Sequence, residues 1–156
     1  MSAVTLRGAI PTGSLLVLDS SVVLSYLNGT DAVAPAATIV MDDLVAPGLN
    51  HAAISTITVM EALVRPIQSG SSLVAMVETF LRHFANLAIV AVDYDIARAA
   101  ADVRARTGLK APDAIVIATA LVGGGVLIAN DGRWQSAVTK LGHGLRLIHL
   151  DRFLQI

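Results

Sequence analysis

Short apolar runs alternate with helix-like segments along the whole chain. Continuous apolar runs predict buried strands at 14–18, 52–57, 87–92, 126–129 and 145–150. Between them, apolar positions at helical spacing predict helices at 22–27, 36–45, from 58 onward, 71–85, 93–107, 112–122 and 134–141. Strands that alternate with helices predict an α/β domain with a central, mainly parallel sheet and helices on both faces.

The segment from Lys110 to Asp131 has the clearest pattern. Pro112 suits the first turn of a helix, and the apolar residues from Ala114 to Leu121 cover nearly all sides of that helix, which predicts that it is buried. Three glycines at 123–125 end the helix, and a strand at 126–129 follows. The glycines precede a strand and lack a following Lys-Ser/Thr pair, so they indicate a turn and not a phosphate-binding loop.

Length and composition favour one globular domain. The chain has 156 residues, and we expect residues 1–13 to be a loose N-terminal extension of a domain that spans 14–156. The chain contains no cysteine, which excludes disulfides and thiolate metal sites and is compatible with a reducing cytoplasm. No uncharged run is long enough to span a membrane, so we expect a cytoplasmic protein. A net charge of −1 gives no general attraction to nucleic acid.

Acidic residues recur at the ends of predicted strands and the starts of predicted helices. They are Asp19, Glu61, Asp113 and Asp131. The carboxyl ends of parallel strands share one edge of a sheet, so these side chains are candidates for a single site. Each acid also has a structural alternative: Asp19 as a helix cap, Glu61 in a capping box with Thr58, Asp113 as a partner of the helix dipole, and Asp131 in a turn.

A cluster of carboxylates would require a counter-charge. Two carboxylates about 4 Å apart repel each other by about 4 kcal/mol at an effective dielectric constant near 20. Such a cluster must share protons or bind a cation, and ligation by oxygen alone suits Mg²⁺ or Mn²⁺. A carboxylate site of this kind is typical of cation-assisted attack of water on a phosphodiester.

Four ordered segments resemble the motifs of PIN-domain ribonucleases, and the VapC-type toxins of VapBC toxin–antitoxin pairs are the most similar group. The segments are LVLDSSVVL, ISTITVMEAL, KAPDAIVIATA and LIAND, and the resemblance covers about residues 14–150. It implies a three-layer α/β/α domain in which Asp19, Glu61, Asp113 and Asp131 are catalytic and bind Mg²⁺ or Mn²⁺, supported by Ser21 and Asn130. Family members often have Asn where this chain has Ser21, and Thr where it has Ala129. The resemblance also implies an RNA substrate, an inhibitory antitoxin and a homodimer.

Basic residues near the predicted edge have two possible roles. Lys110, Arg65 and Arg133 either contact RNA phosphates or are ordinary surface charges, and Arg65 is spaced to form an i,i+4 ion pair with Glu61.

Two other functions stay open on the sequence alone. One is a phosphoacceptor receiver-like domain, although Asp19 is not part of an acidic pair. The other is a PIN-type fold used only for binding.

Overall fold

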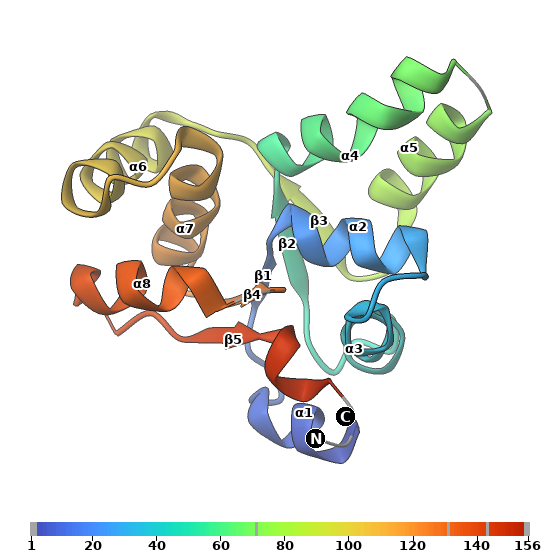
Figure 1. The fold of residues 1–156 in the computed structure, drawn as a ribbon, viewed down its shortest axis with the longest axis horizontal. Coiled ribbons are helices and arrows are strands. Elements are labelled where there is room, and N and C mark those ends of the chain that lie inside the picture. Colours follow the sequence, from blue (N-terminus) through green and yellow to red (C-terminus); the bar gives the residue numbers. More distant parts are fainter. Residues whose placement is uncertain (1–2, 71, 131, 143, 155–156) are drawn as a thin grey trace.

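A computed structural model describes residues 3–70, 72–130, 132–142 and 144–154 (Figure 1). Its strands are β1 (Leu16–Leu18), β2 (Ala52–Ser55), β3 (Leu87–Val90), β4 (Val126–Ala129) and β5 (Leu147–His149). Its longer helices are α1 (Ala3–Ala9), α2 (Ser20–Asn28), α3 (Ala34–Thr38), α4 (Thr56–Ser69), α5 (Leu73–His83), α6 (Tyr94–Thr107), α7 (Ala111–Gly123) and α8 (Gln135–Leu141). Short turns of other helix types are η1 (Ile39–Val45), η2 (Gly132–Trp134) and η3 (Leu150–Phe153).

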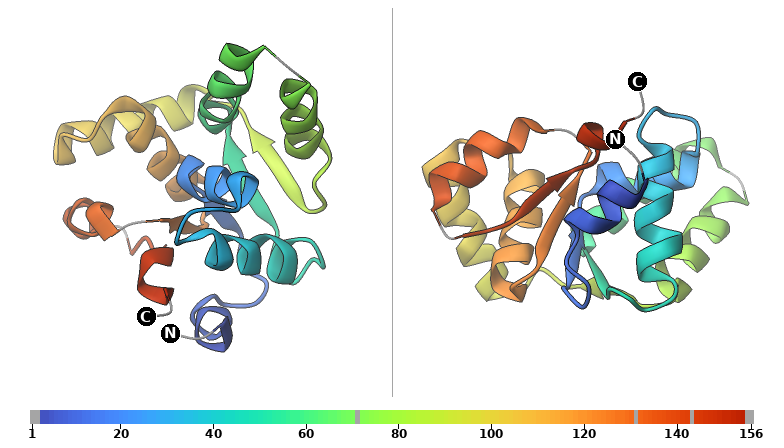
Figure 2. Two further views of the ribbon diagram at one scale, coloured as in Figure 1. Left: turned by 45° about the vertical axis from the view of Figure 1, so that its right-hand side comes forward. Right: turned by 90° about the horizontal axis from the view of Figure 1, so that it is seen from below.

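The strands form one sheet in the order β3-β2-β1-β4-β5, and every neighbouring pair is parallel. The predicted parallel α/β architecture is therefore confirmed. Helices cover both faces, with α6, α7 and α8 on one side of the sheet and α2 and α3 on the other (Figures 1 and 2). This strand order also differs from the 2-1-3-4-5 order of receiver-type domains, which removes the receiver-like alternative.

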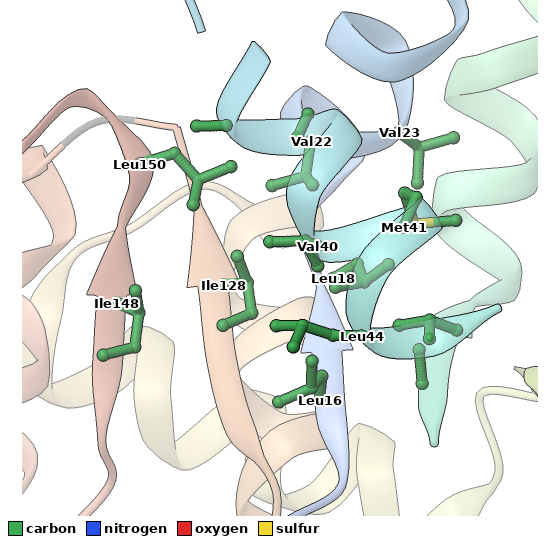
Figure 3. Packing of buried hydrophobic residues seen from close by; sticks show 14 of the residues in the cluster. Leu16, Leu18, Val22, Val23, Val40, Met41, Leu44, Ile128, Ile148 and Leu150 are labelled. Carbon is green, nitrogen blue, oxygen red and sulfur yellow. The ribbon is translucent and has the colours of Figure 1, made fainter. Parts of the chain in front are cut away.

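Side chains of the central strands alternate between two hydrophobic layers. Leu16 and Leu18 of β1 point into the layer formed with α2, α3 and η1, where Met41 and Leu44 also pack (Figure 3). Val17 lies between them in sequence and points into the opposite layer, which contains the buried residues of α6 and α7. The same alternation occurs in β4. Burial of both faces explains why these strands are apolar without interruption.

Helix α7 fills one of these layers, as its pattern predicts. Residues 116–120 are all buried, and Gly124 ends the helix with a left-handed backbone at φ 68°. The thirteen residues of α7 rise about 1.5 Å each, so the helix runs back across the sheet before β4 begins. Its first turn, with Asp113, therefore lies near the carboxyl ends of the strands.

The prediction of a loose N-terminal extension is wrong for the residues that the structure describes. Residues Ala3–Ala9 form α1, and Leu6 and Ile10 are 0% and 3% exposed in the hydrophobic core. Leu6 lies in the helix and Ile10 directly follows it, and both side chains pack into the same hydrophobic cluster. Helix α1 packs beside η3, where Figures 1 and 2 show the two elements next to each other.

The predicted start of α4 is also wrong. The strand ends at Ser55, whose side chain accepts a hydrogen bond from the backbone N–H of Ile57 at 3.2 Å and so caps the helix. A capping box between Thr58 and Glu61 is not formed, and Glu61 lies in the second turn instead of the first. The helix predicted at 36–45 begins as α3 and changes at Ile39 to wider π-helical turns.

Close contact between β4 and β1 makes Gly125 sensitive to substitution. A Cβ atom there would lie 2.9 Å from Val17 Cγ2 and 3.1 Å from the backbone oxygen of Leu15. We expect Gly125→Ala to destabilise the fold by about 1–3 kcal/mol, because a buried neighbour and a strand backbone must both move. Gly123→Ala is the matched control, since its Cβ would lie 3.5 Å from Leu15 Cδ2, an ordinary contact. Urea unfolding of both variants measures the difference, and equal stability would contradict the prediction.

Candidate active site

A cleft of about 490 Å³ lies at the carboxyl edge of the sheet. Its acidic and neutral polar side chains come from Asp19 after β1, Ser21 in α2, Asp113 in α7 and Asn130 after β4. The remaining lining residues are Gly108, Leu109, Lys110, Ala129, Arg133 and Trp134. Segments far apart in the sequence therefore meet at the edge where ligands of parallel α/β folds bind.

Asp19 is held at the end of β1 by both its backbone and its side chain. Its N–H donates to the oxygen of Ile128 at 2.9 Å, which continues the pairing of β1 with β4. Its carboxylate accepts hydrogen bonds from the backbone N–H and the hydroxyl of Ser21 and thereby caps α2. The capping role considered from the sequence is thus real, and it leaves the carboxylate at the wall of the cleft.

The environment of Asp19 disfavours its charge. Burial is the main cause that raises the pKa of the Asp19 carboxyl, which exposes only 9% of its surface. The hydrogen bonds from Ser21 oppose this shift, whereas the negative charges of Asp113 and Glu61 raise the pKa further. Asp113 and Glu61 thus both lie within electrostatic range of Asp19, and a cation bound beside Asp19 would offset both the cost of its burial and the repulsion.

Asp113 enters the cleft from the first turn of α7. Lys110 precedes the helix, and Pro112 occupies an early position where a missing N–H costs no hydrogen bond. Asp113 is half-buried, and a carboxylate in this turn is favoured by the positive end of the helix dipole. The helix dipole would stabilise the negative charge of Asp113, and that charge lies in the same cleft as Asp19, so the two roles of Asp113 are compatible.

Glu61 is placed differently from the other acids. It is half-buried on α4 and does not line the cleft, although it is close enough to raise the pKa of Asp19. The expected ion pair between Glu61 and Arg65 is absent from the described part of the chain. Glu61 is therefore not neutralised by Arg65.

Asp131 lies outside the described residues, so its place relative to the other acids stays a prediction. Within residues 3–70, 72–130, 132–142 and 144–154, no group of three or more acidic or histidine side chains is close enough together to hold a metal ion. The structure brings Asp19 and Asp113 to one cleft, with Glu61 nearby. Convergence of all four acids on one ion remains a prediction.

Asn130 and Ser21 join the ends of β4 and β1. The backbone N–H of Asn130 donates to Ser21 Oγ at 3.3 Å, and Asn130 Nδ2 donates to the backbone oxygen of Ser21 at 3.0 Å. Ser21 Oγ in turn donates a hydrogen bond to Asp19 Oδ2. Ser21 thus connects Asn130 to the Asp19 carboxylate, and its hydrogen bond occupies the Oδ2 atom of that carboxylate.

Two positively charged side chains line the cleft. Lys110 and Arg133 line it and are exposed, whereas Arg65 is exposed on α4 and does not line it. Trp134 and Leu109 also line the cleft, and the sequence pattern did not single them out. The only signal for Trp134 was its position three residues after Asp131.

The oxygen-rich lining fits Mg²⁺ or Mn²⁺ better than softer metals. Carboxylates, a hydroxyl and a carboxamide are the polar groups of Asp19, Asp113, Ser21 and Asn130, and the chain has no cysteine. Asp19 is buried beside other negative charges, which is a setting that a hard divalent ion stabilises.

A search for membrane-spanning helices among the described residues finds none of sufficient length and hydrophobicity.

A comparison with known families decides the classification. The sequence model of the PIN domain matches residues 16–141, which is most of the chain. The chain belongs to the PIN-domain family. The matched region of this PIN domain contains Asp19, Glu61, Asp113 and Asp131, and it includes every residue that lines the cleft. No match is found among curated proteins.

Solved structures share the fold of this PIN domain at low sequence identity. A toxin–antitoxin complex from Klebsiella pneumoniae is 22% identical with a TM-score of 0.65, and the match covers 88% of this chain and 98% of the other. VapBC2 from Rickettsia felis, solved with a DNA fragment from the promoter, is 16% identical with a TM-score of 0.63 and coverages of 86% and 98%. FitAcB from Neisseria gonorrhoeae is 17% identical with a TM-score of 0.61 and coverages of 87% and 97%.

Proposed function

We propose that this PIN domain is a metal-dependent endoribonuclease and the toxin of a type II toxin–antitoxin pair. The observation that carries the proposal is the cleft at the carboxyl edge, where the buried Asp19 faces Asp113 within a PIN fold. Lys110 and Arg133 border the same cleft and are suited to contact phosphates of a nucleic-acid strand. Negative charge inside the cleft and positive charge at its border match a cation-bound phosphodiester.

In this proposal, Mg²⁺ or Mn²⁺ is held by Asp19, Asp113, Asp131 and Glu61. The bound ion would lower the pKa of water and offset the charge that develops on the phosphate. Ser21 holds the Asp19 carboxylate in place through its hydroxyl, and Asn130 holds Ser21. Both bonds from Ser21 go to Oδ2 of Asp19, so Oδ1 of the same carboxylate would be available to the ion.

Lys110 and Arg133 position the RNA strand in this proposal. Both are exposed at the wall of the cleft, so their side chains reach phosphates without losing most of their hydration. Arg65 lies outside the cleft lining, and any contact with RNA would involve a part of the strand beyond the cleaved bond. The modest net charge of −1 becomes +1 when one divalent ion is bound among the acids.

Antitoxin binding, homodimerisation and action in the cytoplasm are part of the same proposal. The likeness in fold to proteins described as toxin–antitoxin and VapBC complexes, at TM-scores of 0.65 and 0.63, supports the antitoxin partner. Homodimerisation and action in the cytoplasm rest on the resemblance of the sequence motifs to VapC-type toxins. A nuclease directed at cellular RNA requires an inhibitor in the cell that makes it. Co-expression with a small protein encoded by a neighbouring gene, followed by co-purification of the two proteins, would test antitoxin binding.

Cleavage of RNA by the purified chain, freed of any bound protein, tests the proposed activity. We expect cleavage of a structured RNA in Mg²⁺ or Mn²⁺, complete loss in EDTA, and recovery when excess Mn²⁺ is restored, because the carboxylates cannot act without a counter-ion. Electrophoresis of an end-labelled RNA measures the products. Cleavage that persists in EDTA would contradict the proposal, and a PIN fold that only binds RNA would give no products in any condition.

A further inference from the structure

A directional chain of hydrogen bonds runs from Asp31 to the candidate site. Ser25 Oγ donates to Asp31 Oδ2 at 2.7 Å, and Asn130 Nδ2 donates to Ser25 Oγ at 2.6 Å. Ser25 is only 2% exposed, whereas Asp31 lies at the surface in the loop after α2. The chain therefore joins a surface carboxylate to the side chain of Asn130 at the end of β4.

The Asp31 carboxylate determines which group donates in each of these hydrogen bonds. An ionised carboxylate only accepts hydrogen bonds, so the Ser25 hydroxyl must donate its hydrogen to Asp31. That leaves a lone pair of Ser25 Oγ for Asn130, and only the nitrogen of the Asn130 carboxamide is a donor. The second bond of Asn130 Nδ2, to the backbone oxygen of Ser21, favours the same orientation.

The opposite end of the Asn130 carboxamide is consequently turned away from α2. Asn130 Oδ1 is buried and has no hydrogen-bond partner in the described part of the chain. Buried acceptors are nearly always paired, with protein or with ordered water. Asn130 belongs to the lining of the cleft, so the group that satisfies Oδ1 is expected in the cleft, next to the carboxylates.

We propose that Ser25 and Asp31 are positioning residues for the active site, and this inference rests on the proposed function. Together they fix the Asn130 carboxamide with its nitrogen toward α2 and its oxygen on the opposite side, where a group bound at the carboxylate site would supply the missing hydrogen bond. The reversed carboxamide would present an NH₂ group to the same place. A donor there repels a divalent cation and removes an acceptor from its surroundings.

Asp31→Asn is the sharpest test, because it reverses the hydrogen bond between residue 31 and Ser25 with almost no change in shape. Asp31 Oδ1 accepts from the backbone N–H of Val33 at 3.0 Å, so that N–H will hold the oxygen of the introduced carboxamide. Its nitrogen then faces Ser25 Oγ and donates to it. The Ser25 hydroxyl thereby loses its acceptor at position 31, so Ser25 no longer selects the nitrogen of the Asn130 carboxamide. Only the bond to the Ser21 backbone oxygen then holds that orientation, and we expect the flipped carboxamide to become populated.

Ser25→Ala removes the link altogether, and Ser20→Ala is its matched control. Ser20 is on the same helix and 8% exposed, and its side chain makes no hydrogen bond in the described part of the chain. We expect Asp31→Asn and Ser25→Ala to weaken Mn²⁺ binding by about tenfold, the lower end of the range for groups that support metal ligands. Ser20→Ala should bind Mn²⁺ as the wild type does.

Two measurements separate positioning from general damage to the fold. Mn²⁺ affinity is measured by the loss of the free-ion EPR signal in a titration of each variant. The Asn130 side-chain NH₂ resonance is followed by ¹⁵N NMR without metal, and it is identified as the signal that Asn130→Ala removes. We expect this resonance to move in Asp31→Asn while the NH₂ signals of Asn50 and Asn86 stay in place.

The outcomes are distinguishable. Weaker Mn²⁺ binding together with a displaced Asn130 signal supports the inference. If the wild type binds Mn²⁺ and both variants bind it equally well, or if the Asn130 signal does not move, the inference is overturned and the proposed function stands. If the wild type itself binds no Mn²⁺, the proposed function fails and the positioning role fails with it.

Discussion

Asp113→Asn is expected to lower the rate of RNA cleavage by about 100-fold or more, because even groups that only support metal ligands change activity by 10–100-fold. Asp113 lines the cleft and its charge raises the pKa of Asp19, so the two carboxylates are near neighbours. Asparagine keeps the shape of the side chain and removes the charge that would bind the cation. The loss should appear as slower cleavage at saturating RNA, measured in Mn²⁺.

The control for Asp113→Asn is Asp95→Asn. Asp95 lies in the first turn of α6, just as Asp113 lies in the first turn of α7, so both charges interact with a helix N-terminus. Such an interaction contributes about 0.3–1 kcal/mol to stability. We expect Asp95→Asn to cleave RNA as fast as the wild type. If both variants behaved alike, Asp113 would be only a helix partner and its catalytic role would be refuted.

The segment from α7 to β4 could be predicted because local and tertiary requirements agree there. Residues 116–120 are buried and apolar except for Thr119, Pro112 suits the helix start, and Gly124 adopts the left-handed backbone that ends it. The strand at 126–129 was predicted with the boundaries that the structure has. Burial on all sides leaves little freedom for alternative boundaries.

The start of α4 could not be predicted from local signals alone. Both Ser55 and Thr58 are acceptable helix caps, and Thr58 is followed by Glu61 at the spacing of a capping box. Pairing of β2 with β3 continues to Ser55, opposite Val90, and the helix begins directly after it. Sheet register therefore selected the earlier cap and moved Glu61 one turn into the helix.

The acids of the candidate site were visible in the sequence, whereas their supports were only partly so. Asp19 and Asp113 sit at element ends, where a pattern of strands and helices brings them to one edge. The link between Asn130 and Ser25 joins residues 105 positions apart, and Ser25 lies in the middle of a helix with no local signal. Such a bond becomes visible only when the sheet register is known.

A second expected result is that Asp19→Asn raises the melting temperature of the metal-free protein. Burial and neighbouring acids raise the pKa of the Asp19 carboxyl, so ionisation of this group weakens the fold as the pH rises from the usual aspartate range toward neutrality. Asparagine removes that charge, and it is as good a helix cap as aspartate for accepting the N–H of Ser21. Each kcal/mol of relieved repulsion should add roughly 2–4 °C.

The sign of the effect should reverse when Mn²⁺ is added. At a free ion concentration of about 100 times its Kd, binding stabilises the wild type by about 2.7 kcal/mol, or roughly 5–10 °C. Asp19→Asn loses a ligand and should gain far less. The variant is therefore more stable than the wild type in EDTA and less stable in saturating Mn²⁺, and differential scanning calorimetry in both conditions measures the crossing.

This crossing separates a metal-binding carboxylate from a structural one. If Asp19 served only to cap α2, its replacement by asparagine would leave the melting temperature nearly unchanged, and Mn²⁺ would affect both proteins equally. If its charge were needed for a structural ion pair, the variant would be less stable in EDTA as well. Only a carboxylate that is destabilising without an ion and required with one gives opposite signs. A wild-type melting temperature that does not respond to Mn²⁺ or Mg²⁺ would contradict the proposed site.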